Sequence, residues 1–115
     1  MMDYKNIQTL EELHQDLHAN PAVLVYFSHQ TCNVCKVLKP KVRDLIANNF
    51  PHITLLYVDT VKYPEVAGQY SVFTVPTILV FFEEKEYVRE SRHISLTSFS
   101  ERIDKLYSVY FKPED

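Results

Sequence analysis

The chain contains two cysteines, Cys32 and Cys35, which are separated by the dipeptide Asn33-Val34. A spacing of three along a first helical turn lets two sulfur atoms meet, so such a pair can cycle between dithiol and disulfide without large backbone movement. Because the motif lies between a predicted strand and a predicted helix, a redox-active dithiol is the leading hypothesis for this site.

The segments on either side of the motif predict how the two thiols differ. The apolar run from Ala22 to Phe27, which follows the break at Asn20-Pro21, is typical of a buried strand. After Cys32, apolar residues recur at a spacing that fits one face of a helix: Val34, Val37, Leu38, Val42, Leu45 and Ile46. Cys32 is therefore expected at the helix N-terminus, where unpaired N–H groups and the helix dipole favour a thiolate. Cys35 is expected to lie one turn deeper and to be less exposed.

Two other readings of the cysteine pair remain open. The pair could belong to a binding or adaptor module whose thiols are incidental or regulatory, or it could bind a metal ion. A closed zinc site needs four ligands, and no second Cys-x-x-Cys or tightly spaced Cys/His pair accompanies this one, so no metal site is predicted. His14 and His18 are four residues apart on a predicted helix, and we interpret them as a solvated pair.

Composition argues against several classes of function. A net charge of −3, with scattered lysines and arginines, provides no basic field for nucleic acid. The single glycine, Gly68, excludes a glycine-rich phosphate loop, so we expect no bound cofactor, and any nicotinamide or flavin chemistry would come from a partner protein. No apolar run approaches the ~20 residues of a membrane-spanning helix.

The length predicts a single domain over residues 1–115, with enough apolar side chains for its own core. Two cysteines do not make a disulfide scaffold, and the start Met1-Met2-Asp3-Tyr4-Lys5 has no apolar stretch typical of a signal peptide. We therefore expect a cytoplasmic protein without membrane association, and we expect it to be a monomer.

Periodicity and breakers predict an alternation of helices and strands. Thr9 and Glu12 form a capping-box pattern before the first helix, and Pro40 is expected to kink the second helix. Pro64 is well placed at the start of a short helix. The predicted elements are a helix over 10–19, a strand over 22–27, a helix after Cys32 that ends near 48–51, a strand over 53–58, a helix over 64–70, a strand over 77–82, a charged turn over 83–86, an edge strand over 87–92 and a helix over 97–111.

This order of elements, with a Cys-x-x-Cys at a helix start, Pro40 five residues later and Val75-Pro76-Thr77 opening a strand, resembles the thioredoxin-like family over residues 22–111. The resemblance implies an α/β fold with three layers, α/β/α, around a mixed central sheet. It also implies that Pro76 is a cis proline lying against the dithiol and that the backbone of Val75 pairs with an extended substrate peptide.

The same resemblance assigns roles to the residues of the motif. Cys32 is the expected attacking thiol, which forms a mixed disulfide with the substrate, and Cys35 is the expected resolving thiol. Thr31, Asn33 and Val34 are expected to contact the substrate, together with Val75 and Pro76.

The chain departs from the family pattern at the residue before the first cysteine and at two buried positions that often carry charge in the family. Typical thioredoxins read Trp-Cys-Gly-Pro-Cys-Lys, whereas Thr31 precedes the first cysteine here and the chain has no tryptophan. The buried acid that the family carries six residues before the first cysteine is Tyr26, and the lysine often paired with that acid is Leu55. The usual proton acceptor for Cys35 is therefore missing, and His29 is a candidate replacement.

Two further departures concern the rim of the site. Val34 has a backbone N–H that the family's proline lacks, which predicts added thiolate stabilisation and a more oxidising couple than a typical thioredoxin. The groove-lining glycine expected just after the edge strand falls near Arg92-His93, and this cationic rim predicts a preference for acidic or small thiol substrates.

From the sequence we expect a thiol-disulfide oxidoreductase that exchanges disulfides with protein or low-molecular-weight thiol substrates and is recycled by a reductase or a thiol pool. The alternative is a thioredoxin-like binding or adaptor module with weak or no redox turnover. The sequence carries no motif that decides between reductant, oxidant and isomerase.

Overall fold

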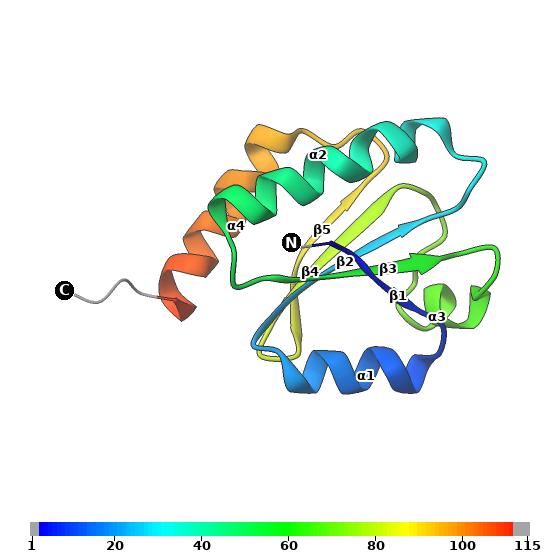
Figure 1. Ribbon diagram of the computed structural model, residues 1–115, viewed down its shortest axis with the longest axis horizontal. Helices are drawn as coiled ribbons and strands as arrows, with labels where there is room; N and C mark the ends of the chain where they lie inside the picture. Colours follow the sequence, from blue (N-terminus) through cyan, green and yellow to red (C-terminus); the bar gives the residue numbers. More distant parts are fainter. Residues whose placement is uncertain (1–2, 112–115) are drawn as a thin grey trace.

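The computed structural model describes residues 3–111 and forms a sheet with helices on both faces (Figure 1). Its elements are β1 (Lys5–Ile7), α1 (Leu10–Ala19), β2 (Ala22–Ser28), α2 (Asn33–Asn49), β3 (Thr54–Asp59), α3 (Pro64–Gln69), β4 (Thr77–Phe82), β5 (Lys85–Ser91) and α4 (Leu96–Tyr110). Within the described residues, no helix is both long enough and apolar enough to cross a bilayer. The predicted domain of residues 1–115 includes residues 1–2 and 112–115, which lie outside the described part.

The five strands form one mixed sheet in the order β1-β3-β2-β4-β5. Strand β3 is parallel to both β1 and β2, as expected for strands joined by helical crossovers, while β4 is antiparallel to β2 and β5 is antiparallel to β4. This mixed sheet confirms the predicted three-layer α/β fold.

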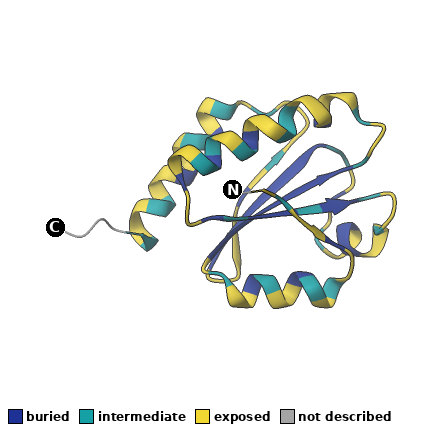
Figure 2. Ribbon diagram, in the orientation of Figure 1, coloured by how far each residue is buried: buried dark blue, intermediate teal, exposed yellow. Residues whose placement is uncertain are grey.

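The sheet divides the interior into two apolar clusters, one on each face, because alternate residues of a strand point to opposite sides. Residues of β2 such as Leu24 and Tyr26 pack with α2 and α4 on one face. Their neighbours Val25 and Phe27 pack with α1 and α3 on the other face. Figure 2 shows the result, with buried strands at the centre and exposed outer faces on the helices.

The N-terminal segment differs from the sequence-based expectation, which began the fold with a helix. The three residues of β1 pair with β3, from Lys5 opposite Leu56 to Ile7 opposite Val58. Only Ile7 is buried, so the segment has no alternating pattern long enough to predict a strand. The capping prediction is confirmed, since the Glu12 amide donates to Thr9 Oγ1 at 3.1 Å.

Helix α2 begins where the sequence predicts and continues through Pro40, but the predicted apolar face is partly wrong. Val42 and Ile46 are buried in the core, together with Cys35. Val34 and Val37 instead remain 63% and 60% exposed. Cys35, which lies between these two valines in the sequence, is fully buried, so their exposure reflects their position around the helix. Cys35, Val42 and Ile46 share one side of α2, and a helix of 3.6 residues per turn rotates Val34 and Val37 away from that side.

The turn between β4 and β5 is shorter than the predicted charged turn over 83–86. Glu83 and Glu84 alone form it, both with positive φ, at 51° and 68°. Lys85 already pairs with Phe82, so β5 begins two residues earlier than expected. A two-residue hairpin of this kind needs left-handed backbone at its centre, which Asn-Gly adopts more readily than two glutamates.

We predict that replacing Glu83→Asn and Glu84→Gly together raises the free energy of unfolding by about 1 kcal/mol, because asparagine and glycine adopt positive φ with less strain than glutamate. Urea denaturation followed by circular dichroism measures the change. Glu83→Gln with Glu84→Gln is the matched control, since it removes both charges but keeps both Cβ atoms. An equal gain in the control would show that charge, rather than backbone conformation, limits the turn.

Candidate active site

Three chain segments meet beyond the carboxyl end of β2 and form the candidate site. The loop after β2 leads into Cys32, the segment before β4 contains Val75 and Pro76, and the segment after β5 begins at Arg92. They meet because Thr77, the first residue of β4, pairs with Phe27 on one side and with Ser91 on the other. The sheet register therefore assembles the site from residues far apart in the sequence.

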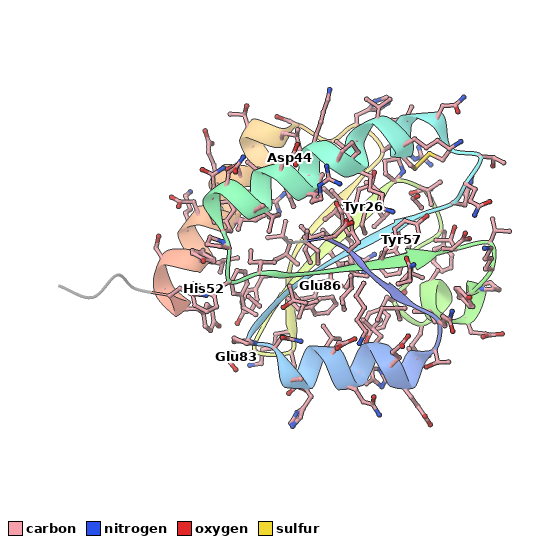
Figure 3. All side chains as sticks on the ribbon, viewed as in Figure 1. Tyr26, Asp44, His52, Tyr57, Glu83 and Glu86 are labelled. Carbon is pink, nitrogen blue, oxygen red and sulfur yellow. A yellow bond between two sulfur atoms is a disulfide. The ribbon has the colours of Figure 1, made fainter. Side chains whose placement is uncertain are left out.

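Cys32 and Cys35 form a disulfide at the start of α2, with their Cα atoms 5.3 Å apart (Figure 3). Cys32 is the N-cap residue, and its Sγ accepts a hydrogen bond from the Cys35 amide at 3.2 Å. Cys35 is fully buried, whereas Cys32 is partly exposed. This geometry agrees with the expected asymmetry between an accessible sulfur at the helix N-terminus and a deeper one.

The peptide bond between Val75 and Pro76 is cis, as the resemblance implied. Pro76 is buried, while Val75 is partly exposed. The Pro76 carbonyl accepts a hydrogen bond from the Arg92 amide at 2.9 Å. This bond joins the segment before β4 to the segment after β5 at the rim of the site. On the motif itself, Thr31, Asn33 and Val34 are exposed.

Tyr26 occupies the position where the family carries a buried acid, and its role was not anticipated from the sequence. Its hydroxyl donates a hydrogen bond to the Cys35 carbonyl oxygen at 2.9 Å, in a fully buried position. Burial, with a smaller contribution from Tyr57, raises the pKa of Tyr26 above its ordinary value of 10.0. The phenol is therefore neutral at physiological pH and acts as a hydrogen-bond donor to the backbone of the second cysteine.

Tyr26 belongs to an aromatic cluster between the sheet and α2, in which its ring stacks on that of Tyr57 at 6.3 Å between centroids (Figure 3). The Lys39 ammonium lies 3.8 Å from the Tyr57 ring centroid, and burial lowers the pKa of Lys39. The Tyr4 hydroxyl donates to the Lys39 carbonyl at 2.9 Å. Burial also raises the pKa of Tyr4, so its phenol, like that of Tyr26, is neutral at physiological pH. The eight tyrosines of the sequence indicate aromatic packing, but their positions along the chain do not show that these three meet beneath the motif.

His29, the candidate proton acceptor, lies on the loop between β2 and the motif. Its Nδ1 is 3.0 Å from Thr31 Oγ1, and its carbonyl accepts a hydrogen bond from the Cys32 amide at 3.3 Å. The backbone of His29 therefore contacts Cys32, while the contact of its ring is with Thr31. Leu55, at the position of the family's lysine, is buried in the core.

Metal-binding side chains are dispersed over the described surface. Among residues 3–111, no three histidine, cysteine, aspartate or glutamate side chains come together as a metal site would require. The Nδ1 atom of His18, one of the two histidines on α1, lies 3.1 Å from Glu84 Oε1. His14 instead packs edge-on near the ring of Tyr70, with the two ring centroids 6.4 Å apart.

Comparisons with known proteins agree on the family. The sequence model of the family "Thioredoxin" matches residues 5–105. The chain is 28% identical over 110 residues to the thioredoxin-like protein YdfQ of Bacillus subtilis, covering 96% of this chain and 97% of that protein. It is 39% identical over 79 residues to a thioredoxin of Chlamydia trachomatis, covering 69% of this chain and 76% of that protein.

Solved structures give the same result for the fold. The crystal structure of Fasciola hepatica thioredoxin superposes with a TM-score of 0.79 at 27% identity, covering 88% of this chain and 97% of that one. A mutant thioredoxin from Halobacterium salinarum has a TM-score of 0.79 at 20% identity, covering 98% and 95%.

A mixed sheet followed by a helix that begins with a disulfide-forming Cys-x-x-Cys is the architecture of a thiol-disulfide oxidoreductase. With the family match spanning most of its length, this chain belongs to the thioredoxin family. It is a divergent member, because a tyrosine stands where the family has its buried acid.

We predict that Tyr26→Phe lowers the free energy of unfolding of the oxidised protein by about 1 kcal/mol, because the ring packing is kept while a buried hydrogen bond to Cys35 is lost. Thermal or urea unfolding measures the difference. Tyr57→Phe is the control, since its hydroxyl contacts Ser28 Oγ in a less buried position and a smaller loss is expected. Unchanged stability of Tyr26→Phe would contradict the assigned role of its hydroxyl.

Proposed function

We propose that this protein exchanges disulfides with protein substrates through Cys32 and Cys35 and is recycled by a reductase or a thiol pool in a reducing cytoplasm. The observation that supports this proposal best is the asymmetry of the pair. Cys32 is partly exposed at the N-terminus of α2 and accepts a hydrogen bond from a backbone amide, while Cys35 is buried behind it. Such an environment favours one accessible thiolate and one protected thiol in the reduced state.

In the reducing direction, the Cys32 thiolate attacks one sulfur of a substrate disulfide. A mixed disulfide forms, the substrate S–S bond breaks, and the departing substrate thiolate takes up a proton from water. The Cys35 thiolate then attacks Cys32 Sγ, which forms the Cys32–Cys35 disulfide and releases the second substrate sulfur as a thiolate. Two electrons pass to the substrate, and the partner reductase or thiol pool returns them to the cysteine pair.

The residues around the pair hold the substrate in this proposal. Val75, which is partly exposed next to the cis proline Pro76, pairs through its backbone with an extended substrate segment, as in β-strand addition. The exposed residues Thr31, Asn33 and Val34 contact the substrate on the side of the helix. Their exposure next to a partly buried sulfur supports this role.

The proton of Cys35 follows a different route from that of a thioredoxin with a buried acid. Tyr26 hydrogen-bonds the Cys35 carbonyl, but its raised pKa makes it a neutral donor rather than a base. In this proposal, water or the neighbouring His29 accepts the proton when Cys35 attacks the mixed disulfide.

We predict that Cys35→Ser accumulates a mixed disulfide between Cys32 and a disulfide-containing peptide, because the serine hydroxyl cannot resolve it. Intact-mass spectrometry after alkylation measures the adduct, and reduction by dithiothreitol should remove it. Cys32→Ser is the matched control and should form far less adduct, because the remaining thiol is buried. If neither variant forms an adduct, the binding or adaptor reading replaces the oxidoreductase.

We predict a reduction potential less negative than the thioredoxin value of about −270 mV, because Val34 keeps the backbone N–H that proline would remove near the thiolate. Equilibration in defined dithiol/disulfide buffers, with alkylated cysteines counted by mass spectrometry, measures the potential. Val34→Pro should shift it to more negative values. A wild-type potential at or below about −270 mV would contradict the role given to Val34. Comparing the measured potential with that of the cytosolic glutathione pool assigns the direction of exchange.

A further inference from the structure

A groove runs beside the cysteine pair, between the first turns of α2 and the segment that follows β5. It has a volume of about 470 Å³. Its apolar lining includes Val34, Val37 and Leu38 from the helix and Ile94 from the facing segment. Lys41 and Arg92 contribute the charged side chains. We call the first set of residues the apolar strip of the groove and the two charged residues its cationic rim.

The apolar strip is exposed in a way that the fold itself does not require. Val34 and Val37 are 63% and 60% exposed, although most other valines of the chain are buried in the core. They lie in the first turns of α2, two and five residues after the N-cap Cys32, so their exposed surface is close to that sulfur. Their apolar surface is suited to cover a side chain close to the cysteine of a substrate.

The charges around the groove are all of one sign. Lys36 and Lys41 on α2 and Arg92 beyond β5 form no ion pair within the described residues 3–111. The nearest acid along β5, Glu90, is paired with Arg102. The whole chain nevertheless carries a net charge of −3, so the groove is locally cationic on a protein that is acidic overall.

Arg92 is held at the rim by its backbone. Its amide donates to the Pro76 carbonyl at 2.9 Å, and its φ is 63°, a conformation that favours glycine. Glycine would be the least strained residue at this position, yet the chain has an arginine there, whose guanidinium group lines the groove. Guanidinium forms paired hydrogen bonds with carboxylates, which makes an acidic group its natural partner.

We infer that this groove binds an extended, acidic segment of a protein substrate, with an apolar side chain next to the reactive cysteine and carboxylates facing Lys41 and Arg92. This inference rests on the proposed function and specifies its substrate class. During exchange the groove orients the segment while Cys32 attacks its disulfide, and the two electrons come from the reduced Cys32/Cys35 pair.

The test compares three short synthetic peptides of equal length, each closed by one disulfide with a valine beside the first cysteine. The flanking residues are glutamate, glutamine or lysine. Single-turnover reduction by the reduced wild-type protein is followed by acid quenching and chromatography. Each rate is divided by the rate for neutral dithiothreitol, which corrects for the intrinsic reactivity of each disulfide. The acidic peptide should react roughly fivefold faster than the neutral one and the lysine peptide more slowly, with the ratios shrinking above about 0.15 M salt.

Substitutions of the charged groove residues test whether the groove causes the preference for the acidic peptide. Arg92→Gly suits the positive φ and should fold, and with Lys41→Gln it should reduce the acidic-to-neutral ratio to below roughly twofold. Lys85→Gln is the matched control, because this exposed lysine lies at the opposite end of the β4–β5 hairpin from Arg92. The control should keep the wild-type ratio.

Equal normalised rates for the three peptides would overturn the inference while leaving the proposed function intact. An equal loss of preference in Lys85→Gln would also overturn it, because overall charge rather than the groove would then be responsible. If the wild-type protein reduces none of the peptides, the proposed function fails and the inference fails with it.

Discussion

The complete burial of β2 is the constraint on which the rest of the structure depends. All seven residues of this strand are buried, and it pairs with β3 on one side and β4 on the other. Alternate side chains of β2 supply both apolar clusters, so helices must cover both faces of the sheet. Beyond the carboxyl end of β2 the chain is no longer enclosed by neighbouring strands, and α2 begins there. The unpaired backbone amides of its first turn surround Cys32. The chemistry of the pair is thus located by the packing of a strand that contains neither cysteine.

The interior beneath the cysteines is held together by neutral aromatic groups. Tyr26 ties β2 to the Cys35 carbonyl, and its ring stacks against Tyr57, over which Lys39 of α2 lies. A carboxylate in the same place would have to be desolvated or paired, whereas a phenol satisfies the buried carbonyl without charge. In this chain Tyr26 therefore supports the backbone of Cys35 by a hydrogen bond but does not accept the proton of the Cys35 thiol.

Long periodic segments could be predicted from the sequence, and the site could be predicted only in part. The runs after Asn20 and Val75, together with the capping pattern at Thr9, correctly predict β2, β4 and α1, because burial and capping are local signals. Strand β1 was missed because its pairing with β3 is a tertiary contact of only three residues. The exposure of Val34 and Val37 was missed for a related reason, since the broad apolar face predicted for α2 does not show which side of it packs on the sheet, and the buried side is that of Cys35, Val42 and Ile46. The cis peptide before Pro76 was expected only through the resemblance to a family, and the Tyr26 hydrogen bond depends on packing across the sheet.

The short strand β1 also has a consequence for how the folded protein avoids self-association. Without it, β3 would be an outer strand with apolar residues and unpaired backbone groups along its free side, which is a template for pairing with another chain. Strand β1 covers that side, and Lys5 is anchored to α1 by an ion pair with Asp16 at 2.9 Å. Two of its three residues are exposed and polar, so the new outer strand is short and hydrophilic. Strand β1 thus protects β3 from intermolecular β-sheet growth.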